Sequence, residues 1–276
     1  MMPDAEAPAV RAGQGPAVDS RAAAPRLVRA ERIMGTVIRI ELVDGRDRDP
    51  LVEQVFAWFR EVDARFSLYR ADSEMSRVAR GELREPDAHP DIREVIDACE
   101  AVWVRSEGAF DIRSHRADGL LDPTGLVKGW SADRAGAMLL AAGVRDWSVN
   151  AGGDILVHGH PHPGQDWRIG IQHPRRREAI ATVVVGSDLA VATSGDYERG
   201  DHIVDPRGRT APGSLLSVTV VGPSLALADA YATAAFSMAD EAPGWIASVP
   251  DYEGVVITAE DRVIRTEGMD RFREQG

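Results

Sequence analysis

The stretch that decides the fold is residues 121–157, LDPTGLVKGWSADRAGAMLLAAGVRDWSVNAGGDILV. Its pattern predicts a turn rich in glycine and proline, then a helix over about residues 131–142 that ends at Gly143. A strand over residues 147–150 follows, and after a glycine pair comes a second strand. We expect the rest of the chain to be organised around this helix and these strands.

Lys128 is the only lysine in the chain, because 31 of the 32 Lys+Arg residues are arginine. It lies between Gly125 and Gly129, which let the backbone come close to a bulky group, and six residues after Asp122. A compact ammonium near a helix start suits a phosphate or nucleotide. A helix-capping turn with an exposed lysine explains the same residues equally well, so both interpretations stay open.

Composition limits the classes of function. The 276 residues are enough for a full core, and 44% hydrophobic with 28% charged residues is typical of an ordinary globular protein. A formal net charge of −12 argues against nucleic acid or an anionic membrane as a general partner. A phosphorylated substrate must therefore be neutralised locally, by a few basic groups or by a metal ion.

No apolar run approaches the length of a membrane span, and no secretion signal or lipid-accepting cysteine stands near the start of the sequence. A cytoplasmic location is the resulting expectation, and it would fail if the sequence is trimmed at its N-terminus. The single cysteine, Cys99, excludes an internal disulfide and falls on the apolar side of a helical pattern, which favours a buried and inert thiol.

The chain divides into a tail and a folded part. Residues 1–26 are too poor in large apolar groups to fold, which predicts a disordered tail. Residues 27–276 are expected to form one domain, and two intimately packed subdomains remain an alternative. Strands and helices interleave without a regular β-α-β alternation, which predicts an α+β fold with mixed, mostly antiparallel sheets and packed helices.

Local patterns place the individual elements. Helices are expected from Asp49, from a cap at Asp72 or Ser73, and from Pro90. The other expected elements are one strand over 32–42 opened by Met34 and Gly35, a strand opening with Phe110 and carrying Asp111, strands over 167–171, 182–185, 188–195, 202–209 and 215–222, a helix over 225–239 and a hairpin over 255–266.

Three groups of residues are candidates for chemistry. Asp229 and Thr233 lie four residues apart, on one face of the alanine-rich helix, and their oxygens suit Mg²⁺. A structural aspartate and a threonine bonded to its own turn is the commoner use of this spacing. His202 is a candidate base or phosphate ligand, although a lone histidine is more often structural. The alternating histidines of residues 158–162 are expected to form a solvated loop.

Nine short motifs, taken in order, resemble the FAD:protein FMN transferases of the ApbE family. The motifs are IMGT (33–36), FSLYRADSEMSR (66–77), GAFDI (108–112), DPTGLVKGWSADR (122–134), VNAGGDI (149–155), ATSGDYER (192–199), HIVDP (202–206), SVTVVGP (217–223) and ADAYATAAF (228–236). The resemblance implies an ApbE-like fold, similar to the tunnelling-fold arrangement. It also implies Mg²⁺-dependent transfer of FMN from FAD, which is a substrate, to a Ser or Thr of a target protein, with release of AMP.

The resemblance also assigns residues. It implies FAD contacts from Met34, Tyr69, Ala109, Phe110, Asp111, Asp122 and Lys128. It implies a metal held by the Gly125 carbonyl, the Asp229 carboxylate and the Thr233 hydroxyl, with Asp229 and His202 as catalytic residues and His202 as the base. The acceptor is expected to be another protein with a flavinylation motif resembling D-x-x-[ST]-G-A-[ST], which this sequence lacks.

Two alternatives remain open at this stage. A metal-dependent FAD pyrophosphatase would use water in place of the acceptor hydroxyl and would give FMN and AMP. A flavin-binding protein without turnover is the other, because DPTG at residues 122–125 replaces the DLG-like run that is usual in the family.

Overall fold

The computed structural model describes residues 25–114, 120–176, 178–195, 205–208 and 213–274. Along the chain the elements are β1 (Leu27–Ile33), β2 (Thr36–Leu42), α1 (Asp49–Phe66), α2 (Glu74–Ala79), η1 (Glu85–Asp87), α3 (Pro90–Arg105), α4 (Thr124–Ala141), β3 (Trp147–Ala151), β4 (Asp154–His158), β5 (Trp167–Gln172), β6 (Ile180–Gly186), β7 (Leu189–Gly195), β8 (Leu215–Gly222), α6 (Leu225–Ser237), η2 (Ala239–Glu241), α7 (Ala242–Ala247), β9 (Glu253–Thr258), β10 (Val263–Arg265) and η3 (Glu267–Phe272).

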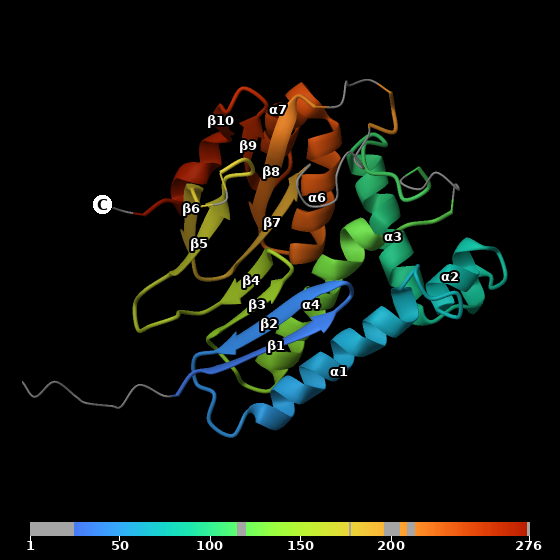
Figure 1. Cartoon of the computed structure of the whole chain (residues 1–276), viewed down its shortest axis with the longest axis horizontal. Helices are drawn as coiled ribbons and strands as arrows, with labels where there is room; N and C mark the ends of the chain where they lie inside the picture. Colours follow the sequence, from blue (N-terminus) through green and yellow to red (C-terminus); the bar gives the residue numbers. More distant parts are fainter. Residues whose placement is uncertain (1–24, 115–119, 177, 196–204, 209–212, 275–276) are drawn as a thin grey trace, which may run out of the picture.

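Eight strands form one sheet in the order β1-β2-β3-β4-β7-β8-β9-β10, and β5 pairs with β6 in a second sheet. Every strand pair in the described part of the chain is antiparallel. Helices α1, α4 and α6 lie together against the large sheet (Figure 1). The α+β prediction with antiparallel pairing is therefore confirmed.

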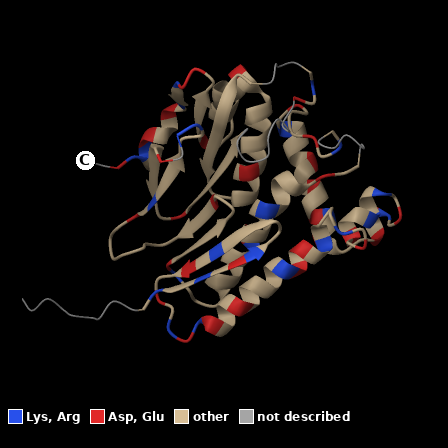
Figure 2. Cartoon of the chain, viewed as in Figure 1, with Lys and Arg blue, Asp and Glu red and all other residues tan. Residues whose placement is uncertain are grey.

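The middle of the large sheet, at β7 and β8, is buried on both faces. In β7 the side chains of Ala190 and Ala192 belong to the core beneath the helices, whereas Leu189 and Val191 belong to a second core under the β5–β6 sheet. Successive side chains of a strand point to opposite faces, so one strand can serve both cores. As a result β7 and β8 carry no charged residue and α6 carries only Asp229, as the tan ribbons of Figure 2 show.

Predictions made from local periodicity and capping were accurate. Helix α1 has Pro50 in its first turn and buries Val55, Phe59, Val62 and Phe66. Short helix α2 is capped by Ser73, whose hydroxyl accepts a hydrogen bond from the backbone N–H of Ser76 at 3.0 Å. Helix α3 begins at Pro90 and buries Cys99, and burial raises the pKa of that thiol to about 12.

The predicted start of the central helix was wrong. Helix α4 begins at Thr124, not near Ser131, so Gly125, Lys128 and Gly129 lie inside its first two turns. These glycines have a packing role: a Cβ on Gly129 would lie 2.3 Å from the carbonyl oxygen of Leu225 in α6. Locally a glycine signals a turn, but here the close approach of two helices outweighs its low helix propensity.

The single strand expected over residues 32–42 is a hairpin. Strands β1 and β2 pair from Leu27 with Leu42 to Ile33 with Thr36, and Met34 and Gly35 form the two-residue turn between them. Both turn residues have positive φ, 55° and 71°, as a type I′ turn requires. Glycine adopts this conformation at no steric cost, whereas it strains Met34.

Two other predicted strands were not found among the described residues. Phe110 to Ile112 form a bend and a turn after α3, although Phe110 itself is buried. In the predicted strand over 202–209, residues 205–208 form a turn in which the Gly208 N–H donates to the carbonyl of Asp205 at 3.0 Å. Residues 202–204 and 209 lie outside the described residues. No described helix is long and apolar enough to cross a bilayer.

Candidate functional site

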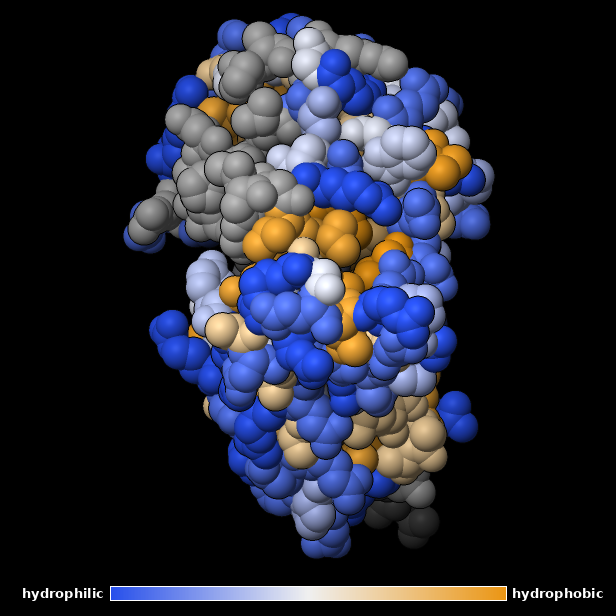
Figure 3. All heavy atoms as spheres, turned by 90° about the vertical axis from the view of Figure 1, so that its right-hand side faces the viewer, coloured by the Kyte–Doolittle hydropathy of each residue, from blue (hydrophilic) through white to orange (hydrophobic). Residues whose placement is uncertain are grey.

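A cavity of about 840 Å³ lies between the β1–β2 turn, the end of α1 and the first turns of α4. It is lined by Met34, Gly35, Thr36, Asp63, Phe66, Ser67, Leu68, Tyr69, Asp122, Thr124, Val127, Lys128 and Gly152. Figure 3 shows apolar surface gathered halfway along one face of the molecule, bordered by hydrophilic side chains. Small-molecule sites typically measure about 300–1,000 Å³, so this cavity has the size of a ligand site.

The start of α4 supplies polar groups to the cavity. One oxygen of Asp122 accepts hydrogen bonds from the backbone N–H of Thr124 at 3.0 Å and from its hydroxyl at 2.6 Å. The N–H of Asp122 donates to the carbonyl of Ile112 at 2.7 Å, which ties this turn to the segment after α3. Asp122 therefore stabilises the turn that leads into α4 and also lies on the cavity wall.

Lys128 sits between two buried carboxylates. Its ammonium is in direct contact with Asp154 Oδ2 and lies 3.7 Å from Asp229 Oδ2. The Lys128 side chain is 17% exposed, that of Asp154 2% and that of Asp229 7%. The other oxygen of Asp154 accepts the backbone N–H of Thr193 at 3.0 Å. Helix α4, helix α6 and strands β4 and β7 thus meet at one ammonium group.

The expected metal ligands come together at this same place. Thr233 lies one turn beyond Asp229 on α6, and its hydroxyl hydrogen bonds to that of Ser194 on β7 at 3.2 Å. Gly125 faces them from α4, and a Cβ there would lie 3.7 Å from the Thr233 hydroxyl oxygen. Carboxylate, hydroxyl and backbone carbonyl oxygens are the ligands that Mg²⁺ accepts, and it keeps several waters besides.

No group of three or more His, Cys, Asp or Glu side chains in the described ranges is arranged to hold a metal ion. The expected ligand set contains one carboxylate, so waters or the phosphates of a substrate would complete the coordination. Oxygen donors of this kind are compatible with a magnesium ion that keeps several waters.

Helix α6 is fixed against α4 by a carboxylate at its N-terminus. Asp133 of α4 accepts hydrogen bonds from the Ser224 hydroxyl at 2.8 Å and from the N–H groups of Leu225 at 2.9 Å and Ala226 at 3.0 Å. Burial raises the pKa of Asp133 despite these three bonds. Together with the close packing at Gly129, this contact sets where Asp229 stands relative to Lys128.

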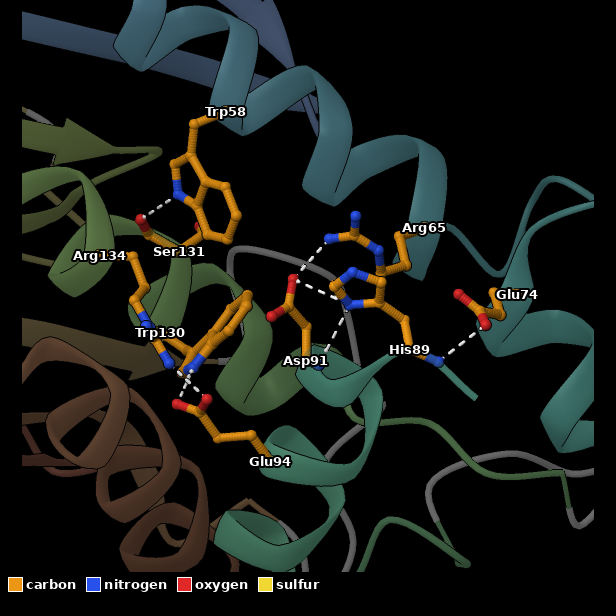
Figure 4. Close-up of polar contacts among 9 residues, drawn as sticks. All are labelled: Trp58, Arg65, Glu74, His89, Asp91, Glu94, Trp130, Ser131 and Arg134. Atoms are coloured by element: carbon orange, nitrogen blue, oxygen red, sulfur yellow. Dashed lines mark hydrogen bonds and ion pairs between the residues drawn. The ribbon is translucent and has the colours of Figure 1, made fainter. Parts of the chain in front are cut away.

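A second face of α4, toward α1 and α3, packs through large side chains (Figure 4). The Trp130 ring lies 5.4 Å from that of Trp58 and 5.6 Å from that of Phe66, measured between centroids. The Trp58 indole N–H donates to the Ser131 carbonyl at 3.0 Å, and the Trp130 indole N–H donates to Glu94 at 2.9 Å. Because Phe66 lines the cavity, this cluster supports its floor.

The predicted FAD contacts divide into two groups. Met34, Tyr69, Asp122 and Lys128 all line the cavity, and Tyr69 is fully exposed at its rim. The other three, Ala109, Phe110 and Asp111, are not among its lining residues; the first two are buried, and an Asp111 oxygen accepts the N–H of Arg113 at 2.9 Å. His202 lies outside the described residues.

Sequence reasoning missed three residues of this region: Asp154, Ser194 and Asp133. All three lie inside quoted motifs, VNAGGDI, ATSGDYER and DPTGLVKGWSADR, but none of them received a role. A signal for Asp154 was present, because a charged residue that opens an apolar strand needs a buried partner. The partner is Lys128, 26 residues away. This pairing depends on how β4 lies beside α4.

Comparison with known proteins gives the chain a family. The ApbE family model matches residues 34–121 and 113–256. The chain is 26% identical to the FAD:protein FMN transferase of Vibrio cholerae over 268 residues, which cover 75% of this chain and 80% of that protein. It is 37% identical to the protein of the same name from Rhodobacter capsulatus over 131 residues, or 45% of this chain and 25% of that one.

The fold is shared with solved structures. The flavin transferase ApbE from Vibrio cholerae superposes with a TM-score of 0.79 at 23% identity, over 90% of this chain and 99% of the other. At that identity the structural likeness establishes the fold, while the family model spans most of the sequence and includes the whole cavity wall formed by α4. The chain is therefore a member of the ApbE family.

Proposed function

We propose that the protein transfers FMN from FAD to a Ser or Thr hydroxyl of a target protein, with Mg²⁺ and with release of AMP. Its place in the ApbE family and the name of the relatives, FAD:protein FMN transferase, support this activity. The observation that carries the proposal is the meeting of Lys128, Asp229 and Thr233 beside a ligand-sized cavity.

The cavity offers different chemistry at its two ends. Met34 and the exposed ring of Tyr69 lie toward the hairpin and the end of α1, where a flat flavin ring can stack. Lys128 lies at the α4 end, where its ammonium can hold a phosphate oxygen. FAD would then lie with its isoalloxazine ring at the rim and its pyrophosphate near Lys128.

Asp229, Thr233 and the Gly125 carbonyl would hold the magnesium ion next to that pyrophosphate. Bound there, Mg²⁺ would offset phosphate charge and stabilise the leaving AMP. Local neutralisation of this kind suits a chain with a net charge of −12, which otherwise repels an anionic substrate.

The reaction balances as a phosphoryl-type substitution. The acceptor hydroxyl oxygen forms a bond to the FMN phosphorus, the bond from that phosphorus to the bridging oxygen breaks, and AMP departs with the bridging oxygen. The hydroxyl proton passes to a general base, and His202 is our candidate for it. Water in place of the acceptor hydroxyl would give FMN and AMP, which is the pyrophosphatase alternative.

The test is to separate nucleotides and peptides after incubating the protein with FAD, with and without Mg²⁺. An acceptor peptide of the D-x-x-T-G-A-T type is compared with a matched peptide in which valine replaces both threonines. We expect AMP only with Mg²⁺ and the threonine peptide, in proportion to FMN mass gained by the peptide. AMP formed equally with either peptide would support the pyrophosphatase, and bound but intact FAD in every sample would support a binding protein.

A further inference from the structure

The Lys128 ammonium lies closer to one of its two neighbouring carboxylates than to the other. It contacts Asp154 Oδ2 directly, whereas Asp229 Oδ2 lies 3.7 Å away. Both carboxylates are almost fully buried, so each attracts the ammonium more strongly than it would in water. The preference for Asp154 therefore needs a structural reason.

Asp154 is fixed in place by the sheet. It is the first residue of β4, which pairs with β7 from Val157 with Leu189 to Ile155 with Val191. Just beyond that last pair, the backbone N–H of Thr193 donates to Asp154 Oδ1 at 3.0 Å. One carboxylate oxygen is held by the neighbouring strand while the other contacts the ammonium, so Lys128 must come to Asp154.

We propose that Asp154 is a positioning residue that draws the Lys128 ammonium away from Asp229 and so lets the Asp229 carboxylate bind a divalent cation. The inference rests on the proposed function, because that function gives Asp229 its role as a cation ligand. A lysine ammonium sits on a flexible four-carbon chain. Without the charge of Asp154, the ammonium would move onto Asp229 and compete with the cation there.

The obvious variant, Asp154→Asn, affects the binding of a divalent cation in two ways. It releases Lys128 toward Asp229, and it also removes one negative charge from the neighbourhood. The two effects separate in a double-mutant cycle with Lys128→Gln, since glutamine carries no charge that could compete at Asp229. If charge alone matters, Asp154→Asn weakens cation binding by the same factor with either residue at position 128.

The experiment is calorimetric titration of the full chain with Mg²⁺ alone, for the wild type, both single variants and the double variant. Circular dichroism melts identify a temperature at which all four are folded. With Lys128 present we expect Asp154→Asn to weaken Mg²⁺ binding about 10- to 100-fold, as for other groups that orient metal ligands. In the Lys128→Gln background the same change should alter Mg²⁺ binding less than about threefold, within the usual additivity of independent sites.

Each other outcome is decisive. Equal weakening in both backgrounds would show that Asp154 acts by its charge alone and would overturn the inference while leaving the proposed function intact. If Asp154→Asn binds Mg²⁺ as tightly as the wild type does, the inference is also overturned and the proposed function is again left intact. A wild type that binds no Mg²⁺ would overturn the magnesium site of the proposed function, and this inference with it.

Discussion

Helix α4 has two faces that are packed in opposite ways. Toward α6 it presents Gly129, whose Cα approaches so closely that an added Cβ would lie 2.3 Å from a backbone oxygen. Toward α1 and α3 it presents Trp130, which donates its indole N–H to Glu94 and lies beside Trp58 (Figure 4). The same indole also packs against the ring of Phe66. At the first face two backbones approach so closely that the helices have almost no room to shift. At the second face the contact is made by large side chains.

The difference shows what each face is for. The α6 face sets the distance between Lys128 and Asp229, which come from different helices. A shift of one helix by about an ångström would therefore change the electrostatic interaction between the two side chains. Backbone-to-backbone contact is the stiffest way to set such a distance, because no rotamer can change it. The aromatic face only has to exclude water and support the cavity floor, which large rings can do in more than one arrangement.

The largest expected effect tests whether the α6 face carries the chemistry. Asp229→Ala should lower FMN transfer on the order of a thousandfold, about 4 kcal/mol, because a cation ligand is lost. The melting temperature without Mg²⁺ should stay within a few degrees, since a ligand carboxylate contributes little to the apo protein. Turnover is measured by AMP release and stability by a thermal melt.

The matched control for Asp229→Ala is Asp240→Ala, an exposed aspartate just after α6, which should leave turnover unchanged. A large loss of apo stability in Asp229→Ala would show instead that the aspartate is structural.

The next effect tests the stiffness of this face. Gly129→Ala should lower the free energy of unfolding by about 2–3 kcal/mol, because the added methyl meets the backbone of α6 and the helices must separate. The gain of helix propensity, about 1 kcal/mol, offsets only part of that cost. Urea unfolding measures the change.

Gly244→Ala is the control for Gly129→Ala, since this glycine in α7 has nothing within 4 Å of an added Cβ and alanine there should be neutral or stabilising. Equal stability of the wild type and Gly129→Ala would mean that the two helices can move apart freely.

A smaller, pH-dependent effect concerns the cap at Asp133. Burial raises the pKa of Asp133, so the folded protein holds the proton of this carboxyl group more tightly than the unfolded chain does. The tighter binding of the proton stabilises the folded state fully below the pKa of the unfolded chain, about 3.9. This stabilisation is lost as pH rises through the higher pKa of the folded state. Asp133→Asn cannot titrate, so it should gain stability relative to the wild type as pH rises from about 4 to 7.

Urea unfolding at several pH values measures this difference for Asp133→Asn. Ser224→Ala keeps the titrating group and removes a bond that lowers its pKa, so its loss of stability with rising pH should be at least as large as in the wild type. A constant difference between Asp133→Asn and the wild type would contradict the raised pKa.

The smallest expected effect is on the aromatic face. Trp58→Phe keeps a ring against Trp130 but loses the hydrogen bond to the Ser131 carbonyl, which should cost about 1 kcal/mol of unfolding free energy. Transfer activity should be unchanged. Trp103→Phe, at a side chain that is 44% exposed, is the control and should cost less. A loss of activity in Trp58→Phe would mean that this face also positions the chemistry.

Features encoded by neighbouring residues were predictable. The helix expected from Asp49 is α1, and one of the two residues expected to cap the next helix, Ser73, caps α2, since both features depend on spacings of three or four residues. The hairpin of β1 and β2 was missed because its turn uses Met34, a residue without a turn preference, at positive φ. The helical state of residues 124–130 was missed because the glycines were taken for a turn.

The sequence alone determined the amphipathic helices, most of the strands and, through ordered motifs, the family, because each of these is written in short-range patterns. Tertiary structure decided which charges meet. Lys128, Asp154, Asp229 and the N–H of Thr193 come from four elements and share one location only after α4, α6, β4 and β7 pack together. No local spacing encodes such contacts, because they depend on close backbone packing at Gly129 and on strand pairing across the sheet.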